Sequence, residues 1–177
     1  PSTYATEIAL AKAKSIANKS KIPVLAADTI VVSSKGEIFG KPKDADDARK
    51  MLYNLRGDVH KVITAVALFD PASQEIDSVF NTTRVTFRDC SDDEIEEYII
   101  KGNPYQKAGG YGIQDKVLNP VEEYDGCPLN ILGLPLCSVQ QLFGNIGLNP
   151  FRSIYHQTGK FSHQKCTEIF SRWMSAL

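Results

Sequence analysis

The spacing of apolar and polar residues predicts a chain that mixes helices with strands. Apolar residues recur at helical intervals over 5–18, and acidic residues crowd the first turn of a second helix that follows Asp44. Ser91 and Glu94 have the spacing of a capping box at the start of a third helix. A terminal amphipathic helix is expected over 162–177.

Strands are predicted between these helices. Pro23–Val32 reads PVLAADTIVV, an apolar β-branched run that indicates a buried strand, and Gly36–Gly40 is expected to form a hairpin return. Two longer strands, 61–69 and 77–88, should pair antiparallel across a turn. Residues 132–143 form an apolar segment that fits a strand or a helix. Together the elements predict the α/β (mixed α+β) class.

The composition predicts one globular domain over residues 1–177. Of these residues, 42% are hydrophobic and 23% are charged. Twenty basic and 21 acidic side chains give a net charge of −1, which disfavours a nucleic acid polymer or a membrane surface as partner. A small-molecule substrate is expected instead. Without a long apolar run or a signal-peptide pattern, a cytoplasmic location is expected.

The cysteines and histidines predict no metal site and no covalent catalysis. The four cysteines lack paired CxxC spacing and are interpreted as free thiols: Cys90, Cys127, Cys137 and Cys166. His60 is interpreted as a structural histidine, and neither His156 nor His163 has a spaced partner for zinc. Hydrolysis by an activated water is the chemistry that remains.

Asp28 is the first candidate for chemistry, because a carboxylate inside an apolar strand is costly unless something pairs with it. It could be a general base or a metal ligand on the floor of a cleft. The alternative is an aspartate at the end of the strand, bonded to nearby backbone.

Three lysines and a glycine-rich segment are further candidates. Lys41 lies in the stiff FGKP turn and could neutralise a phosphate, as could Lys12 and Lys107, although exposed lysines are common. The segment 107–114, KAGGYGIQ, ends in Gln114, whose amide could read the edge of a nucleotide base. Its alternative is a glycine-rich turn beside a buried tyrosine.

Six blocks in order resemble the signatures of the Maf family: YATEIALAKA, AADTIVV, FGKP, GDVHKVIT, KAGGYGIQ and NILGLPL. The resemblance covers about residues 1–143, and the segment 149–177 is an unmatched, helical tail. It implies a Maf/ITPase-like fold with a central mixed sheet and a cleft between two lobes. It also implies a metal-assisted nucleoside triphosphate pyrophosphatase that forms a monophosphate and pyrophosphate.

The same resemblance implies roles for individual residues. Asp28 matches the proton acceptor of the family and would also bind the metal, Mg²⁺ or another divalent cation such as Mn²⁺. Lys12 and Lys41 match phosphate-side lysines, and Gln114 matches a glutamine near the base. Thr29 matches a position tied to substrate choice.

Thr29 together with Gln114 resembles the branch that acts on dTTP and UTP. A carboxamide suits a uracil or thymine edge because it offers one donor and one acceptor. Lys107 is assigned to the same substrate site. A homodimer is possible.

The sequence departs from the family in two places. Family members begin with a strand and a Ser/Arg-rich phosphate loop, and Pro1 follows the position of that loop. Asp115 places an extra carboxylate after the glutamine, where it could repel phosphates.

Two alternatives therefore remain open. One is a catalytically impaired Maf-like fragment that serves as a nucleotide-binding or protein-interaction module. Its candidate contact surface consists of aromatic residues in the tail: Phe151, Tyr155, Phe161 and Trp173. The other is a purine pyrophosphatase that acts on ITP, XTP or methylated GTP.

Overall fold

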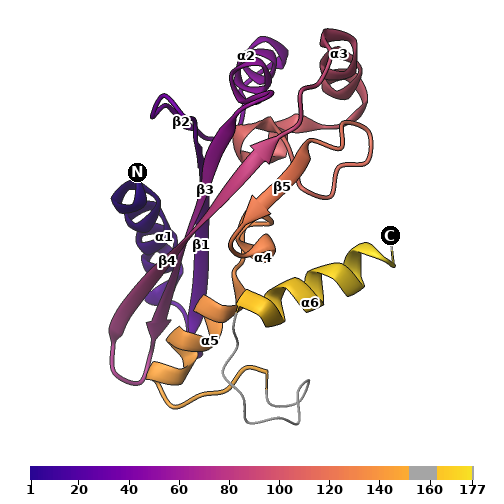
Figure 1. Ribbon diagram of the computed structural model, residues 1–177. Helices are drawn as coiled ribbons and strands as arrows, with labels where there is room; N and C mark the ends of the chain where they lie inside the picture. The colour runs from indigo at the N-terminus through magenta and orange to yellow at the C-terminus, as the bar shows by residue number, and fades with distance from the viewer. Residues whose placement is uncertain (152–162, 177) are drawn as a thin grey trace.

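The computed structural model describes residues 1–151 and 163–176, which form a five-stranded sheet with helices on both faces (Figure 1). The strands are β1 (Val24–Val32), β2 (Ile38–Phe39), β3 (Val59–Asp70), β4 (Glu75–Phe87) and β5 (Val121–Asp125). The helices are α1 (Ser2–Ala17), α2 (Ala45–Leu55), α3 (Asp92–Lys101), α4 (Pro128–Ile131), α5 (Leu136–Asn145) and α6 (His163–Met174). Two 3₁₀ turns, Pro104–Gln106 and Ala108–Gly110, lie between α3 and β5.

The mixed class of helices and strands is confirmed, but the strand directions within the sheet are not mixed. The order is β2-β1-β3-β4-β5, and each pair of described neighbours is antiparallel. Val32, at the end of β1, pairs with Lys61 near the start of β3, and Phe87, at the end of β4, pairs with Val121 at the start of β5. Each connection thus returns to the end of the sheet that it left, which produces antiparallel pairs.

Strand β1 is an edge strand for most of its length. The two-residue strand β2 pairs only with Val31 and Val32, so among the described strands residues 24–30 of β1 have a neighbour on the β3 side alone. The prediction of a buried strand is therefore wrong for residues 25–29, which are half-buried. A pocket lies along this open edge.

Helix α1 covers one face of the sheet through a row of alanines at every fourth position. Ala5, Ala9 and Ala13 are fully buried against a cluster that includes Ile30 of β1 and Ile63 of β3. Residues four apart lie on the same side of a helix, and small side chains allow the helix to approach the sheet closely. The helix expected over 5–18 is confirmed and begins earlier, at Ser2.

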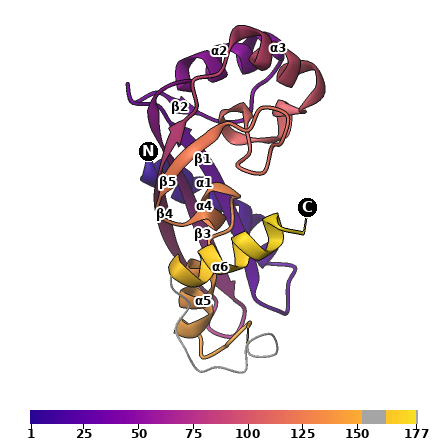
Figure 2. The same ribbon diagram turned by 45° about the vertical axis from the view of Figure 1, so that its right-hand side comes forward.

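Helices α4, α5 and α6 cover the opposite face (Figures 1 and 2). Val139 and Leu142 of α5 pack against β3, so the apolar segment 132–143 contributes to a helix rather than a strand. Phe170 of α6 packs in a cluster with Leu129 of α4. The sequence did not predict β5 or α4.

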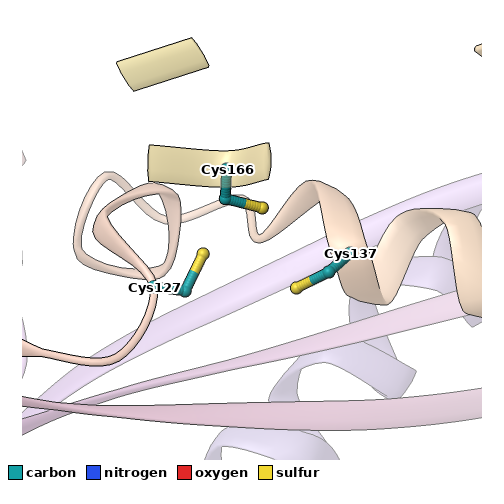
Figure 3. A group of neighbouring side chains, drawn as sticks. All are labelled: Cys127, Cys137 and Cys166. Atoms are coloured by element: carbon teal, nitrogen blue, oxygen red, sulfur yellow. The ribbon is translucent and has the colours of Figure 1, made fainter. Parts of the chain in front are cut away.

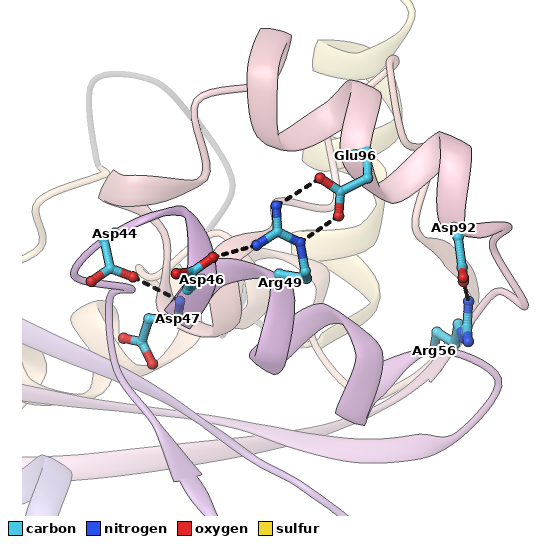
Figure 4. A network of polar contacts seen from close by, with 7 residues as sticks. All are labelled: Asp44, Asp46, Asp47, Arg49, Arg56, Asp92 and Glu96. Atoms are coloured by element: carbon cyan, nitrogen blue, oxygen red, sulfur yellow. Dashed lines mark hydrogen bonds and ion pairs between the residues drawn. The ribbon is translucent and has the colours of Figure 1, made fainter.

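Two arginine–carboxylate pairs join α2 to α3 (Figure 4). Arg49 donates from Nε and Nη2 to both carboxylate oxygens of Glu96, at 2.5 and 2.7 Å, and this hydrogen bonding lowers the pKa of Glu96. Arg56 donates to Asp92. The caps of both helices are as predicted, because Asp44 accepts the backbone N–H of Asp47 and the capping box at α3 is complete.

The described helices bear on the expected absence of a membrane partner. Among the described helices, none combines the length and hydropathy that a bilayer crossing requires. The cytoplasmic location and the homodimer stay predictions. Of the tail aromatics, Tyr155 and Phe161 lie outside the described residues, Phe151 is half-buried, and Trp173 lies beside Phe170 with its ring centroid at 6.2 Å.

Candidate active site

A pocket of about 630 Å³ lies at the open edge of β1. Its walls come from α1, from β1, from the segment 106–114 and from residues 131–133. It gathers all six side chains that the sequence singled out: Lys12, Asp28, Thr29, Lys41, Lys107 and Gln114. Their individual roles stay predictions, but the structure places them around one space.

Asp28 and Thr29 reach this pocket from opposite faces of the sheet. Consecutive residues of a strand point to opposite sides. Asp28 lies on the face covered by α1, where it meets Lys12, whereas Thr29 lies on the α4 face, where its hydroxyl meets Thr64. The pocket therefore wraps around the uncovered edge of β1.

Asp28 forms an ion pair with Lys12 on the pocket wall. Lys12 Nζ donates to Asp28 Oδ1 at 2.6 Å and to the carbonyl oxygen of Ala27 at 3.1 Å. The Asp28 side chain is 15% exposed and the Lys12 side chain 51%. Asp28 Oδ2 has no hydrogen-bond partner among the described residues. The alternative of a strand-end aspartate bonded to backbone is wrong, since Asp28 lies inside β1 and pairs with a lysine.

Lys41 and Lys107 differ in how many hydrogen bonds their ammonium groups make to the protein. Lys41 Nζ donates only to Gln106 Oε1, at 3.3 Å, within the part of the chain that the structure describes. Lys107 Nζ donates to Asp115 Oδ1 at 2.6 Å, and to Tyr98 Oη and the Gly102 carbonyl at 3.1 Å each. An ammonium has three hydrogens, so Lys107 has none left for a phosphate.

Asp115 fixes the glycine-rich segment rather than facing the pocket. Besides pairing with Lys107, it accepts the Tyr98 hydroxyl at 2.5 Å and the Gly112 backbone N–H at 2.7 Å through Oδ2. It does not line the pocket. The repulsion of phosphates expected from this carboxylate is therefore offset by the Lys107 ammonium.

Gln114 lines the pocket and carries a buried amide oxygen. None of the described residues gives this oxygen, Oε1, a hydrogen bond. A methyl group on Gly112 would lie 2.7 Å from this oxygen, so the amide occupies space that only glycine leaves free. A buried acceptor without a donor is unfavourable, and a ligand that donates a hydrogen bond would satisfy it.

The hydroxyl of Thr29 is oriented by a chain of hydrogen bonds. Thr64 Oγ1 donates to the carbonyl oxygen of Asn130 at 2.8 Å, so its contact with Thr29 Oγ1 at 2.9 Å must use Thr29 as the donor. The Thr29 oxygen therefore offers only lone pairs to the pocket. It can accept a hydrogen bond from a ligand but has no hydrogen left to donate.

His60 is a structural histidine, as predicted. It is buried in β3, where Nε2 lies 2.5 Å from the Tyr111 hydroxyl, and burial lowers the pKa of His60 to about 4. The imidazole is thus neutral at pH 7. Burial also raises the pKa of Tyr111, which lines the pocket.

Comparison with known proteins settles the family. A family model described as "Maf-like protein" matches residues 1–146, which is most of the chain. The chain belongs to the Maf family. The match ends within one residue of the end of α5 and does not include α6.

Three curated relatives share the name dTTP/UTP pyrophosphatase. A protein from Dehalococcoides mccartyi named dTTP/UTP pyrophosphatase is 42% identical over 151 residues, which cover 85% of this chain and 67% of the relative. One of the same name from Syntrophomonas wolfei is 44% identical over 156 residues, with 86% and 81% covered. Another, from Geotalea uraniireducens, is 40% identical over 148 residues, with 83% and 76% covered.

The Maf block NILGLPL contains a positioning residue to which the sequence analysis assigned no role. Asn130 is fully buried, and its Nδ2 donates to the Val62 carbonyl at 2.9 Å and to Thr83 Oγ1 at 3.0 Å. These bonds hold the pocket wall formed by residues 131–133 against the sheet. A single polar residue inside an apolar block was the available signal.

Proposed function

We propose that this Maf protein hydrolyses pyrimidine nucleoside triphosphates, dTTP and UTP, to the monophosphate and pyrophosphate. The names of the relatives support this reaction and agree with the expectation from the sequence blocks. The observation that carries the proposal is the Asp28–Lys12 pair, which lies in one pocket with Lys41, Thr29 and Gln114.

Asp28 acts as the general base in the proposed reaction. Its Oδ2 accepts a proton from a water whose oxygen attacks the α-phosphorus. The bond from that phosphorus to the bridging oxygen breaks, and pyrophosphate leaves. Lys12 occupies Oδ1 and orients the carboxylate, while the nearly unengaged Lys41 neutralises charge on the leaving pyrophosphate.

The pocket suits a divalent cation that is held mainly by the substrate. Among the described residues, the one cluster of three or more potential metal ligands lies elsewhere and consists of cysteines, so no carboxylate cage surrounds Asp28. Mg²⁺ characteristically binds one or two carboxylates together with substrate phosphates. Asp28 would hold Mg²⁺ or Mn²⁺, which would neutralise phosphate charge.

Thr29 and Gln114 select the base in this proposal. The N3–H of uracil or thymine is a donor, and neither the Thr29 oxygen nor the buried Gln114 Oε1 receives a hydrogen bond from the residues that the structure describes. The Gln114 amide nitrogen can donate to a neighbouring carbonyl of the base. Cytosine has no N3–H and should be a poorer substrate.

Lys107 takes a different role from the one that its position in the sequence implied. Since Asp115, Tyr98 and Gly102 use all three of its hydrogens, it positions the segment that carries Gln114. We assign substrate contact to Lys41 and Lys12 instead.

Pyrophosphate release tests the proposal on the purified protein. The substrates are dTTP, UTP, CTP, GTP, ITP and XTP, each with Mg²⁺, with Mn²⁺ and with chelator. We expect kcat/KM for dTTP and UTP to exceed the other values at least tenfold and to vanish with chelator. Preference for ITP, XTP or GTP would contradict the role of Thr29 and Gln114. Binding of dTTP by calorimetry without turnover would identify a nucleotide-binding module instead.

A further inference from the structure

Three of the four cysteines meet behind the pocket wall, although their spacing in the sequence predicts no metal site. The sulfur atoms of Cys127, Cys137 and Cys166 all lie within 4.8 Å of one another and point toward a common centre (Figure 3). Cys127 precedes α4, Cys137 lies in the first turn of α5, and Cys166 lies in α6. The proposed hydrolysis uses none of them.

This arrangement has the dimensions of a thiolate metal site. Zinc–sulfur bonds of about 2.3 Å in a tetrahedral site place the sulfur atoms about 3.8 Å apart. Small side-chain rotations that move each sulfur atom by about 1 Å or less would therefore bring these atoms to that spacing. We propose that Cys127, Cys137 and Cys166 bind one Zn²⁺ ion as thiolates.

The surroundings favour a soft cation and give it an entry path. Cys127 and Cys166 are fully buried in an apolar cluster with Leu129 and Phe170, so the ion would be shielded from water on that side. Cys137 is half-buried and lines a second pocket of about 720 Å³, from which a cation would first meet this cysteine. Soft thiolate ligands select zinc over the magnesium that serves the nucleotide.

Two polar side chains, Asn81 and His163, lie beside Cys137 at the rim of the cysteine cluster. Asn81 Nδ2 lies 3.8 Å from Cys137 Sγ in a hydrogen-bonding position, and Asn81 Oδ1 lies 3.2 Å from His163 Nε2. His163 lines the second pocket beside Cys137 and precedes Cys166 by three residues on α6. Water or this imidazole would take the fourth coordination position.

The ion would fasten helix α6 to the Maf domain. Cys127 and Cys137 lie within the residues that the family model matches, and Cys166 lies outside them. Helix α6 packs on α4, and Ile131 of α4 lines the nucleotide pocket. Zinc would thus support the wall of that pocket from behind without touching the substrate.

The metal content of the protein tests the site directly. The protein is purified under reducing conditions without chelator, and zinc is measured by mass spectrometry of the elements. We expect about one zinc per chain in the wild type and in Cys90→Ala, and less than about a tenth of that in Cys127→Ala, Cys137→Ala and Cys166→Ala. Cys90 is the matched control because it is buried in a different cluster.

Measurements on the wild type keep the proposal testable if a variant fails to fold. A mercurial thiol reagent should release one equivalent of zinc, and Co²⁺ in its place should show a thiolate charge-transfer band with the visible bands of a tetrahedral ion. Zinc removal should lower Tm by several degrees. A chain that purifies without zinc and binds no added Zn²⁺ or Co²⁺ would overturn the proposal, and so would a disulfide between two of these cysteines under reducing conditions. None of these readouts depends on hydrolysis of a nucleotide.

Discussion

Replacing Asp28 with asparagine should separate catalysis from stability. Loss of a general base costs about 10² to 10⁴ in rate, which corresponds to about 2.7 to 5.4 kcal/mol of transition-state stabilisation. The pair with Lys12 contributes little to folding, because the Lys12 side chain is 51% exposed and such pairs contribute about 0–1 kcal/mol. An asparagine oxygen can still accept a hydrogen bond from Lys12. The expected change in Tm is therefore at most about 4 °C.

Steady-state pyrophosphate release with dTTP measures the effect on catalysis, and thermal denaturation measures the effect on stability. We expect kcat to fall at least about 100-fold. KM should stay constant or decrease, since the substitution removes a negative charge from a pocket that must receive a triphosphate. Asp77→Asn is the matched control, because Asp77 is an exposed carboxylate on β4, outside the pocket, and accepts a hydrogen bond from Asn145.

Two outcomes would refute this reasoning. A kcat within about threefold of the wild type would show that another group accepts the proton or that none is needed. A large loss of Tm with Asp28→Asn but not with Asp77→Asn would show that the carboxylate is mainly structural, and the kinetic loss could then not be assigned to chemistry.

Three further substitutions test the pocket and the fold around it. Gly112→Ala should displace the Gln114 amide, since the new methyl would lie 2.7 Å from Oε1, and we expect the preference for dTTP over GTP to shrink with Tm nearly unchanged. Lys41→Met should lower kcat/KM by about 10- to 100-fold through loss of a charged contact, whereas Lys35→Met, on an exposed turn, should leave it unchanged. Because the folded pKa of His60 is about 4 and the unfolded value 6.5, the unfolded chain binds a proton first, and stability should fall by about 3 kcal/mol as pH drops from 6.5 to 4. Denaturant titrations of His60→Gln should lack this component, and an unchanged pH profile would exclude His60 as its source.

The sequence predicted the elements whose signals are local. Asp44 and Ser91 begin α2 and α3 as expected, because a cap and its helix lie within four residues of each other. β5 and α4 were missed. β5, Val121–Asp125, contains three acidic residues, so its sequence does not resemble a strand. In the described structure it is held by its pairing with β4. The four-residue helix α4 is too short for a helical period to be recognised.

The candidate site was predictable as a set of residues but not as a geometry. The blocks identified Asp28 and Gln114, yet nothing in the sequence shows that Lys107 would be fully engaged by Asp115 and its neighbours. The cysteine cluster is a stronger case. Cys127 and Cys166 are separated by 38 intervening residues, and only the docking of α6 brings their sulfur atoms together.

The open edge of β1 explains how consecutive residues can serve different parts of one ligand. In the interior of a sheet, Asp28 and Thr29 would face separate layers of the protein, and one small molecule could not contact both. Here β2 pairs only with Val31 and Val32 of β1 in the described structure, so a ligand can reach around the edge to both faces. The α1 face then supplies the carboxylate with Lys12, and the α4 face supplies the acceptor oxygen of Thr29. In the proposed reaction the phosphates meet the Asp28–Lys12 pair and the base meets Thr29, so the short length of β2 would itself serve the function.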